Sequence, residues 1–376
     1  MGGPPGGWVT GRSLADLEST VGETRRTVEG FVVEAGKVEE FARAVGDDDP
    51  LYRSSDVAVE RGFPAIPAPL TFPRVSSFPR YRTDRFDLGF DPKFVLHGEQ
   101  RYEYDRPLLV GDDLHGDTTL TDVYQRDGRR GGTMTFAEFA TEYRTGDGEH
   151  VLTERATAIE TEGAAAEGDA SDDTVETDDD PDETTERQFS GHPTDGDGFA
   201  NPSPPSGTDG GATADDLVGL PVHAGLGGEP TVPEPSAPGS LAAGDVGPEV
   251  RVGPFARQHF VRYAGASGDF NPVHYDEPYA TGAGHPSVFG QGMLTAGVAA
   301  QAVADSVGLG RVRSFGVRFQ SRVWPGDTVT ARATVAEGVD ADGRDATADG
   351  LVLDVAVDTD DGETVLTGTA TVAHDS

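Results

Sequence analysis

The sequence lacks cysteine, contains few lysines and has no long hydrophobic run. None of its 376 residues is cysteine, which excludes disulfides, thiolate nucleophiles and zinc or iron–sulfur sites built on cysteine. No apolar run reaches the roughly 18 residues that a membrane span needs. The N-terminus is rich in glycine and proline and shows no signal-peptide pattern. These absences predict a soluble cytoplasmic protein that has no membrane partner.

Positive charge is also scarce. The chain carries 66 acidic and 29 basic side chains, for a formal charge of -37, and Lys37 and Lys93 are its only lysines. Such a surface repels nucleic acid, so we expect no nucleic-acid partner. An acidic disordered protein would also have this composition, but here the acid is unevenly spread and both ends have strong apolar patterning. We therefore favour adaptation to a salty cytoplasm, where carboxylates stay hydrated and salt screens their repulsion.

The composition divides the chain into three zones. Residues 14–160 and 241–376 have the apolar patterning of folded domains. Residues 161–240 are first strongly acidic and then rich in proline, glycine and serine. This middle zone cannot bury enough apolar area to offset its ordering entropy. We expect two folded domains joined by a disordered linker.

The last zone predicts an α+β fold. Residues 254–266 have a helical pattern, and residues 292–307 predict a longer helix whose small apolar side chains would let it lie buried against a sheet. Partly alternating sequences then predict four strands, at residues 313–323, 328–336, 351–359 and 366–373. A helix followed by an antiparallel meander is typical of the α+β class.

The two folded zones repeat one plan. Residues 46–52 match residues 268–274, and residues 107–112 match residues 322–327, in the same order along the chain. Two such landmarks indicate an internal duplication. The first copy keeps the aspartate of the second but has Tyr52 where the second has a histidine. We therefore expect one working half and one supporting half.

The candidate chemistry lies in the second copy, at Asp269, His274 and Gly292. Asp269 and His274 are five residues apart across a tight turn that contains a proline. A carboxylate and an imidazole over one water can take a proton from it and protonate a carbon. Gly292 opens the long helix, whose unpaired N–H groups and positive dipole end can stabilise an oxyanion. Each residue alone could be structural, as a cap, a core histidine or a connection, but their order favours water addition to an α,β-unsaturated thioester.

With these residues, the second zone resembles the MaoC-like dehydratases, the hotdog-fold family that includes (R)-specific enoyl-CoA hydratases. Residues 263–280 are similar to the hydratase motif of that family nearly throughout. The first zone is similar to the dehydratase-like domain, of fatty-acid-synthase type, that often precedes a MaoC domain. The resemblance implies a double hotdog in which each half is an antiparallel β-sheet wrapped around a central helix. Two such chains could pair as a homodimer.

The resemblance also implies roles for single residues. Asp269 and His274 match the catalytic pair that activates water and shuttles the proton, and Gly292 matches the glycine whose N–H helps form the oxyanion hole. Asn271 matches a loop residue that supports the site on the substrate side. Gln291, a second candidate for substrate binding, stands where family members often carry histidine. The acyl chain would run into a tunnel near the half that has lost its catalytic residues.

The implied reaction is the reversible addition of water to a trans-2-enoyl-CoA, with no metal and no other cofactor. Three alternatives stay open: a hotdog acyl-CoA thioesterase, a mesaconyl-type dicarboxylic acyl-CoA hydratase, and a non-catalytic protein that binds acyl thioesters. Residues 97–101 could bind the pantetheine or phosphates of CoA, although a solvated beginning of a strand is the favoured interpretation.

Overall fold

The computed structural model describes residues 12–91, 94–127, 132–161, 244–336 and 350–373. The linker predicted at residues 161–240 lies outside these ranges apart from its first residue. Within the described ranges, no helix combines the length and the apolar character that crossing a membrane requires.

The first half is a meander of long strands with short helices between them. Its elements are α1 (Leu14–Glu18), β1 (Thr24–Val32), α2 (Ala35–Ala44), η1 (Pro50–Tyr52), α3 (Ser55–Glu60), η2 (Phe72–Ser77), β2 (Val95–Tyr104), β3 (Asp113–Asp127), β4 (Thr133–Thr145) and β5 (His150–Thr161).

The second half has one long helix and shorter strands. Its elements are β6 (Val250–Val252), α5 (Arg257–Ser267), η4 (Pro272–His274), α6 (Glu277–Gly282), α7 (Gly292–Val307), η5 (Leu309–Arg311), β7 (Val312–Phe319), β8 (Val329–Val335), β9 (Leu351–Thr359) and β10 (Thr364–Val372). The helix predicted at residues 292–307 is confirmed at both ends, and all four predicted strands are present.

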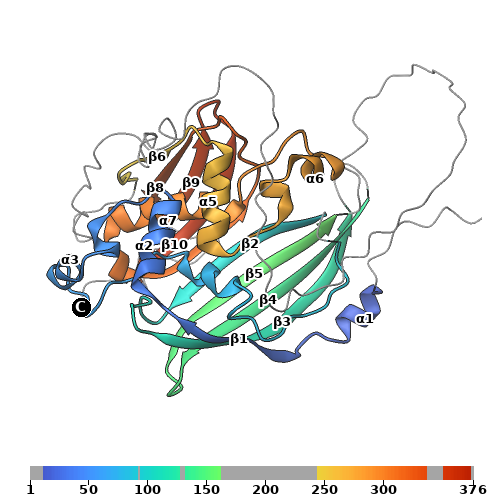
Figure 1. The fold of residues 1–376 in the computed structure, drawn as a ribbon, viewed down its shortest axis with the longest axis horizontal. Helices are drawn as coiled ribbons and strands as arrows, with labels where there is room; N and C mark the ends of the chain where they lie inside the picture. The colour runs from blue at the N-terminus through green and yellow to red at the C-terminus, as the bar shows by residue number, and fades with distance from the viewer. Residues whose placement is uncertain (1–11, 92–93, 128–131, 162–243, 337–349, 374–376) are drawn as a thin grey trace, which may run out of the picture. The chain divides into compact units, whose positions relative to one another are not determined.

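The described strands form one ten-stranded sheet in the order β1-β3-β4-β5-β2-β7-β10-β9-β8-β6. The two halves join where β2 pairs antiparallel with β7, which places Tyr102 opposite Phe315. In Figure 1 the strands of the first half fan out in blue to green, and those of the second half run from yellow at β6 to red. Antiparallel pairing throughout the described strands confirms the predicted α+β class.

Helix α7 lies against the strands of the second half, which its small side chains allow. It contacts β6 and all four strands from β7 to β10. A Cβ added at Gly297 would lie 2.4 Å from a methyl carbon of Val45, which follows α2. Glycine at this position therefore lets the first half approach the central helix of the second.

The corresponding segment of the first half is not a long helix. It is the 3-10 helix η2, which contains Pro73 and follows Pro67 and Pro69. Proline lacks the N–H that continues a helix and clashes with the preceding turn, so this proline-rich stretch cannot form the counterpart of α7. The strands of the first half consequently face a much shorter central element.

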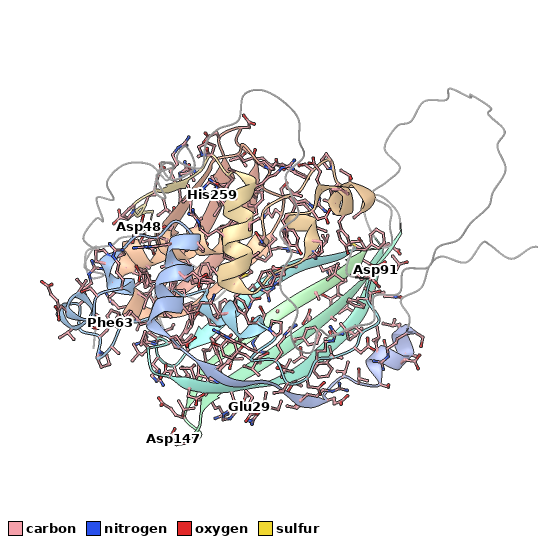
Figure 2. All side chains as sticks on the ribbon, in the orientation of Figure 1. Glu29, Asp48, Phe63, Asp91, Asp147 and His259 are labelled. Carbon is pink, nitrogen blue, oxygen red and sulfur yellow. The ribbon has the colours of Figure 1, made fainter. Side chains whose placement is uncertain are left out.

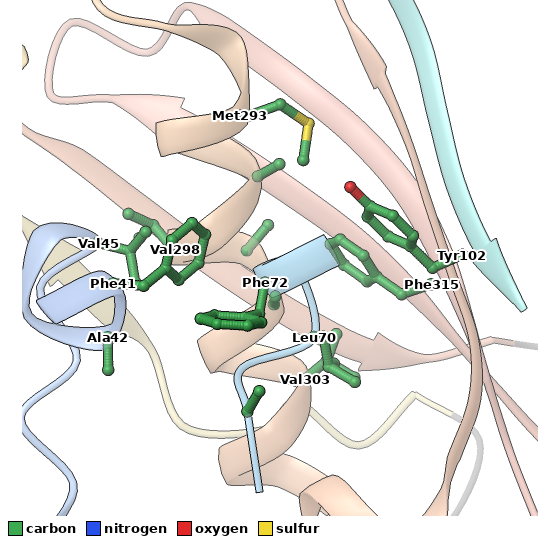
Figure 3. Packing of buried hydrophobic residues seen from close by; sticks show 14 of the residues in the cluster. Phe41, Ala42, Val45, Leu70, Phe72, Tyr102, Met293, Val298, Val303 and Phe315 are labelled. Atoms are coloured by element: carbon green, nitrogen blue, oxygen red, sulfur yellow. The ribbon is translucent and has the colours of Figure 1, made fainter. Parts of the chain in front are cut away.

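One apolar core runs through both halves (Figure 3). It joins Phe41 of α2, Phe72 of η2 and Val298 of α7 to Tyr102 and Phe315 of the paired strands β2 and β7. Each such side chain contributes roughly 1.5–3 kcal/mol on burial. Because many of these contacts cross between the halves, we expect the described residues of the two halves to fold together.

The acidic side chains are mostly at the surface. Glu29, Asp91 and Asp147, which Figure 2 labels, are all exposed to solvent. Exposed carboxylates stay hydrated, as adaptation to a salty environment requires, and that adaptation remains a prediction.

Candidate active site

The loop that carries the candidate residues is shaped by a glycine and an asparagine. Helix α5 ends at Gly268, whose φ of 82° is a left-handed cap that glycine adopts at little cost. A Cβ at Gly268 would lie 2.8 Å from the ring of Phe78. The Asn271 Oδ1 then accepts a hydrogen bond from the Val273 N–H at 3.3 Å and so caps the short helix η4. This cap is the contact that the structure gives for the side chain of Asn271.

His274 is held in one orientation at the end of this loop. It is 7% exposed, and its Nδ1 lies 2.8 Å from the carbonyl oxygen of Phe289. A protonated Nδ1 donates to that carbonyl, which leaves the lone pair of the neutral ring on Nε2. Burial lowers the pKa of His274 and outweighs the opposing effect of Asp269. The imidazole is therefore a neutral base at neutral pH.

Asp269 is kept ionised by a residue of the first half. Its Oδ2 lies 3.2 Å from a guanidinium nitrogen of Arg74, in η2. Burial by itself raises the pKa of Asp269, but the charge of Arg74, and that of His274 when the imidazole is protonated, lower it, and the net pKa is below the ordinary value. A charged carboxylate and a neutral imidazole thus belong to one loop, which suits them to hold and deprotonate one water.

Gly292 is the first residue of α7, so its N–H has no acceptor within the helix. The helix has 16 residues, and its N-terminus carries the positive end of the dipole. A Cβ at Gly292 would lie 3.0 Å from the ring of Phe319. Glycine avoids this contact, and the role of its N–H in an oxyanion hole stays a prediction.

Gln291 connects the two helices of the site. Its side chain is 1% exposed, and its Nε2 donates to the carbonyl oxygen of Phe260 in α5 at 3.1 Å. Its Oε1 is buried and has no hydrogen-bond partner among the described residues. The amide therefore positions the beginning of α7, and its proposed contact with substrate would use Oε1.

Several buried polar atoms near Arg74 have no partner in the described part of the chain. They are the Nε of Arg74, the Nε2 of His97 and the hydroxyls of Tyr102 and Tyr263. Arg74 interacts electrostatically with both tyrosines and with His97, so these groups lie close together. Because buried polar groups nearly always have a partner, this concentration of unpartnered atoms around Arg74 is unusual for the interior of a protein.

The interpretation of residues 97–101 as a solvated beginning of a strand was partly wrong. They do lie in β2, but Gln100 is buried and His97 faces the cluster around Arg74. Burial, followed by the Arg74 charge, lowers the pKa of His97 to about 4. Strand periodicity alone does not tell which of these side chains point inward.

Asp47, which matches Asp269 in the first half, has a raised pKa where that of Asp269 is lowered. Asp47 is buried, and burial together with the nearby carboxylates of Asp305 and Asp49 raises its pKa to about 8. Arg61 pairs with Asp49, at 2.6 Å, rather than with Asp47. A carboxyl group that is protonated at neutral pH cannot serve as a base, and Tyr52 replaces the histidine. These features support a single working site.

Sequence reasoning missed Arg74. It is 195 residues from Asp269 in the chain, and only the packing of η2 beside α5 brings the two together. Within the described residues, no group of three or more histidine and acidic side chains gathers as metal ligands do.

Two family models match the chain, one in each half. Residues 19–154 match the model described as a FAS1-like dehydratase domain region, and residues 244–356 match the MaoC-like domain. A UPF0336 protein of Thermobifida fusca is 36% identical over 135 residues, which cover 35% of this chain and 86% of that protein.

Solved structures share the fold of the described residues. A MaoC-like dehydratase is 24% identical with a TM-score of 0.65, and the match covers 96% of this chain and all of the other. A Mycobacterium tuberculosis protein described as having a double hotdog fold is 16% identical with a TM-score of 0.56, and the match covers 97% of this chain and 98% of that one. The predicted double hotdog is confirmed, with η2 in place of a long central helix in the first half.

Proposed function

We propose that this chain is an (R)-specific enoyl-CoA hydratase, because its first half matches the FAS1-like dehydratase domain region and its second half matches the MaoC-like domain. It would add water reversibly to a trans-2-enoyl-CoA and would equally dehydrate the 3-hydroxyacyl-CoA. The observation that carries the proposal is that Asp269, which Arg74 keeps ionised, and His274, whose Nδ1 faces the Phe289 carbonyl and leaves Nε2 as the base, lie on one loop and influence each other electrostatically.

In the proposed mechanism, one water lies between the carboxylate of Asp269 and the Nε2 of His274. His274 takes a proton as the water oxygen bonds to C3 of the substrate. The negative charge of Asp269 stabilises the imidazolium that forms, as its effect on the pKa of His274 indicates.

The electrons of the C2–C3 double bond move toward the thioester oxygen. The N–H of Gly292 donates to that oxygen and stabilises the enolate. A proton from the Asp269–His274 pair then reaches C2, the carbonyl re-forms, and both side chains return to their starting states. Dehydration follows the same steps in reverse.

The test uses the purified full-length protein in molar salt with crotonyl-CoA, and it follows the loss of enoyl absorbance. Asp269→Asn and His274→Ala should each lower kcat by roughly a hundredfold or more, the usual weight of an acid–base group. Asp47→Asn is the matched control, because it changes the equivalent aspartate of the first half, and it should retain activity.

Normal rates in both site variants would show that the site is assigned wrongly. Release of free thiol with no loss of enoyl absorbance would identify a thioesterase instead. Tight binding of CoA esters with no turnover of any enoyl or hydroxyacyl substrate would identify a binding protein.

A further inference from the structure

Helix α5 ends directly before the loop that carries Asp269, and it packs beside α2 of the first half (Figure 1). The last four carbonyl groups of a helix have no N–H partner within it. One of them in α5, the carbonyl of Gly265, accepts a hydrogen bond from the ammonium group of Lys37 in α2, at 3.0 Å. The first half thus caps the helix from which the candidate loop departs.

A second contact between the first half and the end of α5 is weaker. The hydroxyl of Ser77 in η2 lies 2.8 Å from the carbonyl oxygen of Arg74 and 3.2 Å from that of Ser267. A serine hydroxyl has only one hydrogen to donate, so the shorter contact takes most of it. Of these two donors, Lys37 therefore makes the stronger contact with the backbone of α5.

The ammonium group of Lys37 is largely enclosed. The side chain is 12% exposed, and the group also pairs with Glu40 at 2.9 Å. It lies 4.4 Å from the centre of the Phe78 ring, whose negative face attracts a cation. A positive charge is also favourable at the end of α5, because the C-terminal end of a helix carries the negative end of the dipole. These contacts together hold the ammonium group in one place.

Phe78 connects Lys37 to the candidate loop. A Cβ added at Gly268 would lie 2.8 Å from the Phe78 ring. Phe270 meets the same ring edge to face, with ring centres 5.9 Å apart. Gly268 and Phe270 are the two chain neighbours of Asp269. The residues on both sides of the candidate carboxylate therefore pack on a ring that contacts Lys37.

The choice of lysine at this position is informative. Lys37 and Lys93 are the only lysines of a chain that otherwise uses arginine. An ammonium group is a compact charge whose three N–H bonds point in different directions, whereas a guanidinium presents its donors in one plane. A carboxylate, a backbone carbonyl and an aromatic ring all surround the single nitrogen atom of Lys37. This arrangement suits an ammonium group better than a guanidinium.

We propose that Lys37 is a positioning residue of the hydration reaction: by capping α5 and contacting Phe78, it fixes the backbone that carries Asp269. The proposal rests on the proposed hydratase function and adds a role of the first half in aligning its site. Displacement of a catalytic group by about 1 Å can cost about a hundredfold in rate. Arg74 contacts the carboxylate itself, at 3.2 Å, whereas Lys37 acts on the backbone of the loop.

The experiment replaces Lys37 by methionine in the full-length protein, which keeps the apolar stem and removes the charge and the donors. With crotonyl-CoA, Lys37→Met should lower kcat by about tenfold and change KM by less than about threefold, because Asp269 acts on the water and not on thioester binding. Lys37→Arg keeps a charge and donors and should recover part of kcat.

Arg80→Gln is the matched control. Arg80 also lies beside Phe78, 5.7 Å from the ring centre, but it is exposed and pairs with Glu34 at 3.1 Å. This variant should keep the wild-type kcat and KM. Phe78→Leu removes the ring between Lys37 and the loop, and it should show the same pattern as Lys37→Met. It provides the test if Lys37→Met does not fold.

A double-mutant cycle separates positioning from general support of the fold. In an Asp269→Asn background, Lys37→Met should lower kcat by less than about a further twofold, because the group that it aligns is no longer there. Hydrogen exchange gives a readout that needs no activity. Amides of residues 266–274 should exchange faster in Lys37→Met and in Phe78→Leu than in wild type, and at the wild-type rate in Arg80→Gln.

Three results would overturn the proposal. They are losses in kcat that multiply in the double variant, a rise in KM with kcat unchanged, and wild-type exchange of residues 266–274 in both Lys37→Met and Phe78→Leu. If the wild type hydrated no enoyl-CoA, the hydratase function would be refuted instead. Faster exchange in Lys37→Met would then still show that Lys37 fixes the loop.

Discussion

Replacing Arg74 by glutamine should move the acid limb of the pH–rate profile to higher pH. The Arg74 guanidinium lies 3.2 Å from the Asp269 carboxylate. Burial raises the pKa of that carboxylate, and the charge of Arg74 is the largest of the effects that lower it. Arg74 also lowers the pKa of His274. Loss of the arginine therefore raises the pKa of both members of the pair, so both become protonated at a higher pH.

The size of the shift follows from the distance. Two unit charges 3.2 Å apart attract by about 1.3 kcal/mol in water and by about 5 kcal/mol at an effective dielectric constant of 20. One pKa unit corresponds to about 1.4 kcal/mol, which gives roughly one to four units, and carboxylates beside arginine are typically shifted by about one to three. Because Asp269 and His274 titrate together, the apparent pKa of the acid limb should rise by about one unit or more.

The assay is kcat/KM for crotonyl-CoA from pH 4 to pH 9, since this parameter reports ionisations of the free enzyme. Arg74→Lys should keep the acid limb close to its wild-type position, and Arg80→Gln should not move it. Circular dichroism at each pH separates unfolding from titration. An Arg74→Gln variant that loses activity equally at every pH, with the limb in place, would show that Arg74 supports only the packing.

Three further predictions concern glycine packing and the degenerate half. Relative to wild type, Asp47→Asn should become increasingly stable as the pH rises from about 4 to about 8. The raised pKa keeps the Asp47 carboxyl protonated in the folded state, so the wild type loses stability once this carboxyl ionises in the unfolded chain. Urea unfolding at several pH values measures the difference in the free energy of unfolding. Gly292→Ala should lower kcat by roughly tenfold or more. Its Cβ would lie 3.0 Å from the ring of Phe319, so the ring or the beginning of α7, which carries the proposed oxyanion-hole N–H, would have to shift. Gly297→Ala should destabilise by about 1–3 kcal/mol through overpacking against Val45, as thermal unfolding would detect.

Each of these has its own control. Gly265→Ala is the control for both glycine variants, because Gly265 also lies in a helix and nothing lies within 4 Å of its added Cβ. This variant should retain activity, and its free energy of unfolding should rise by up to about 1 kcal/mol. An unchanged kcat in Gly292→Ala would remove Gly292 from the oxyanion hole. A stability difference between Asp47→Asn and wild type that does not vary with pH would show that Asp47 is already ionised in the folded protein.

The local features of this protein can be predicted from its sequence. Glycine and proline fixed the turn between Asp269 and His274, and small apolar residues fixed α7 at residues 292–307. The repeated landmarks placed two related halves in one chain. These features could be predicted because helix caps, turns and side-chain periodicity depend on residues a few positions apart.

The ionisation of the site residues depends on packing between segments that are distant in the sequence. The pairing of Arg74 with Asp269 and the raised pKa of Asp47 depend on groups that are distant in the chain. The hydrogen bond from His274 to the Phe289 carbonyl selects the tautomer. The short helix η2, which stands where a long helix was expected, lines a cavity of the first half. Charge interactions and burial act through space, so their sign and size follow from packing and not from sequence spacing.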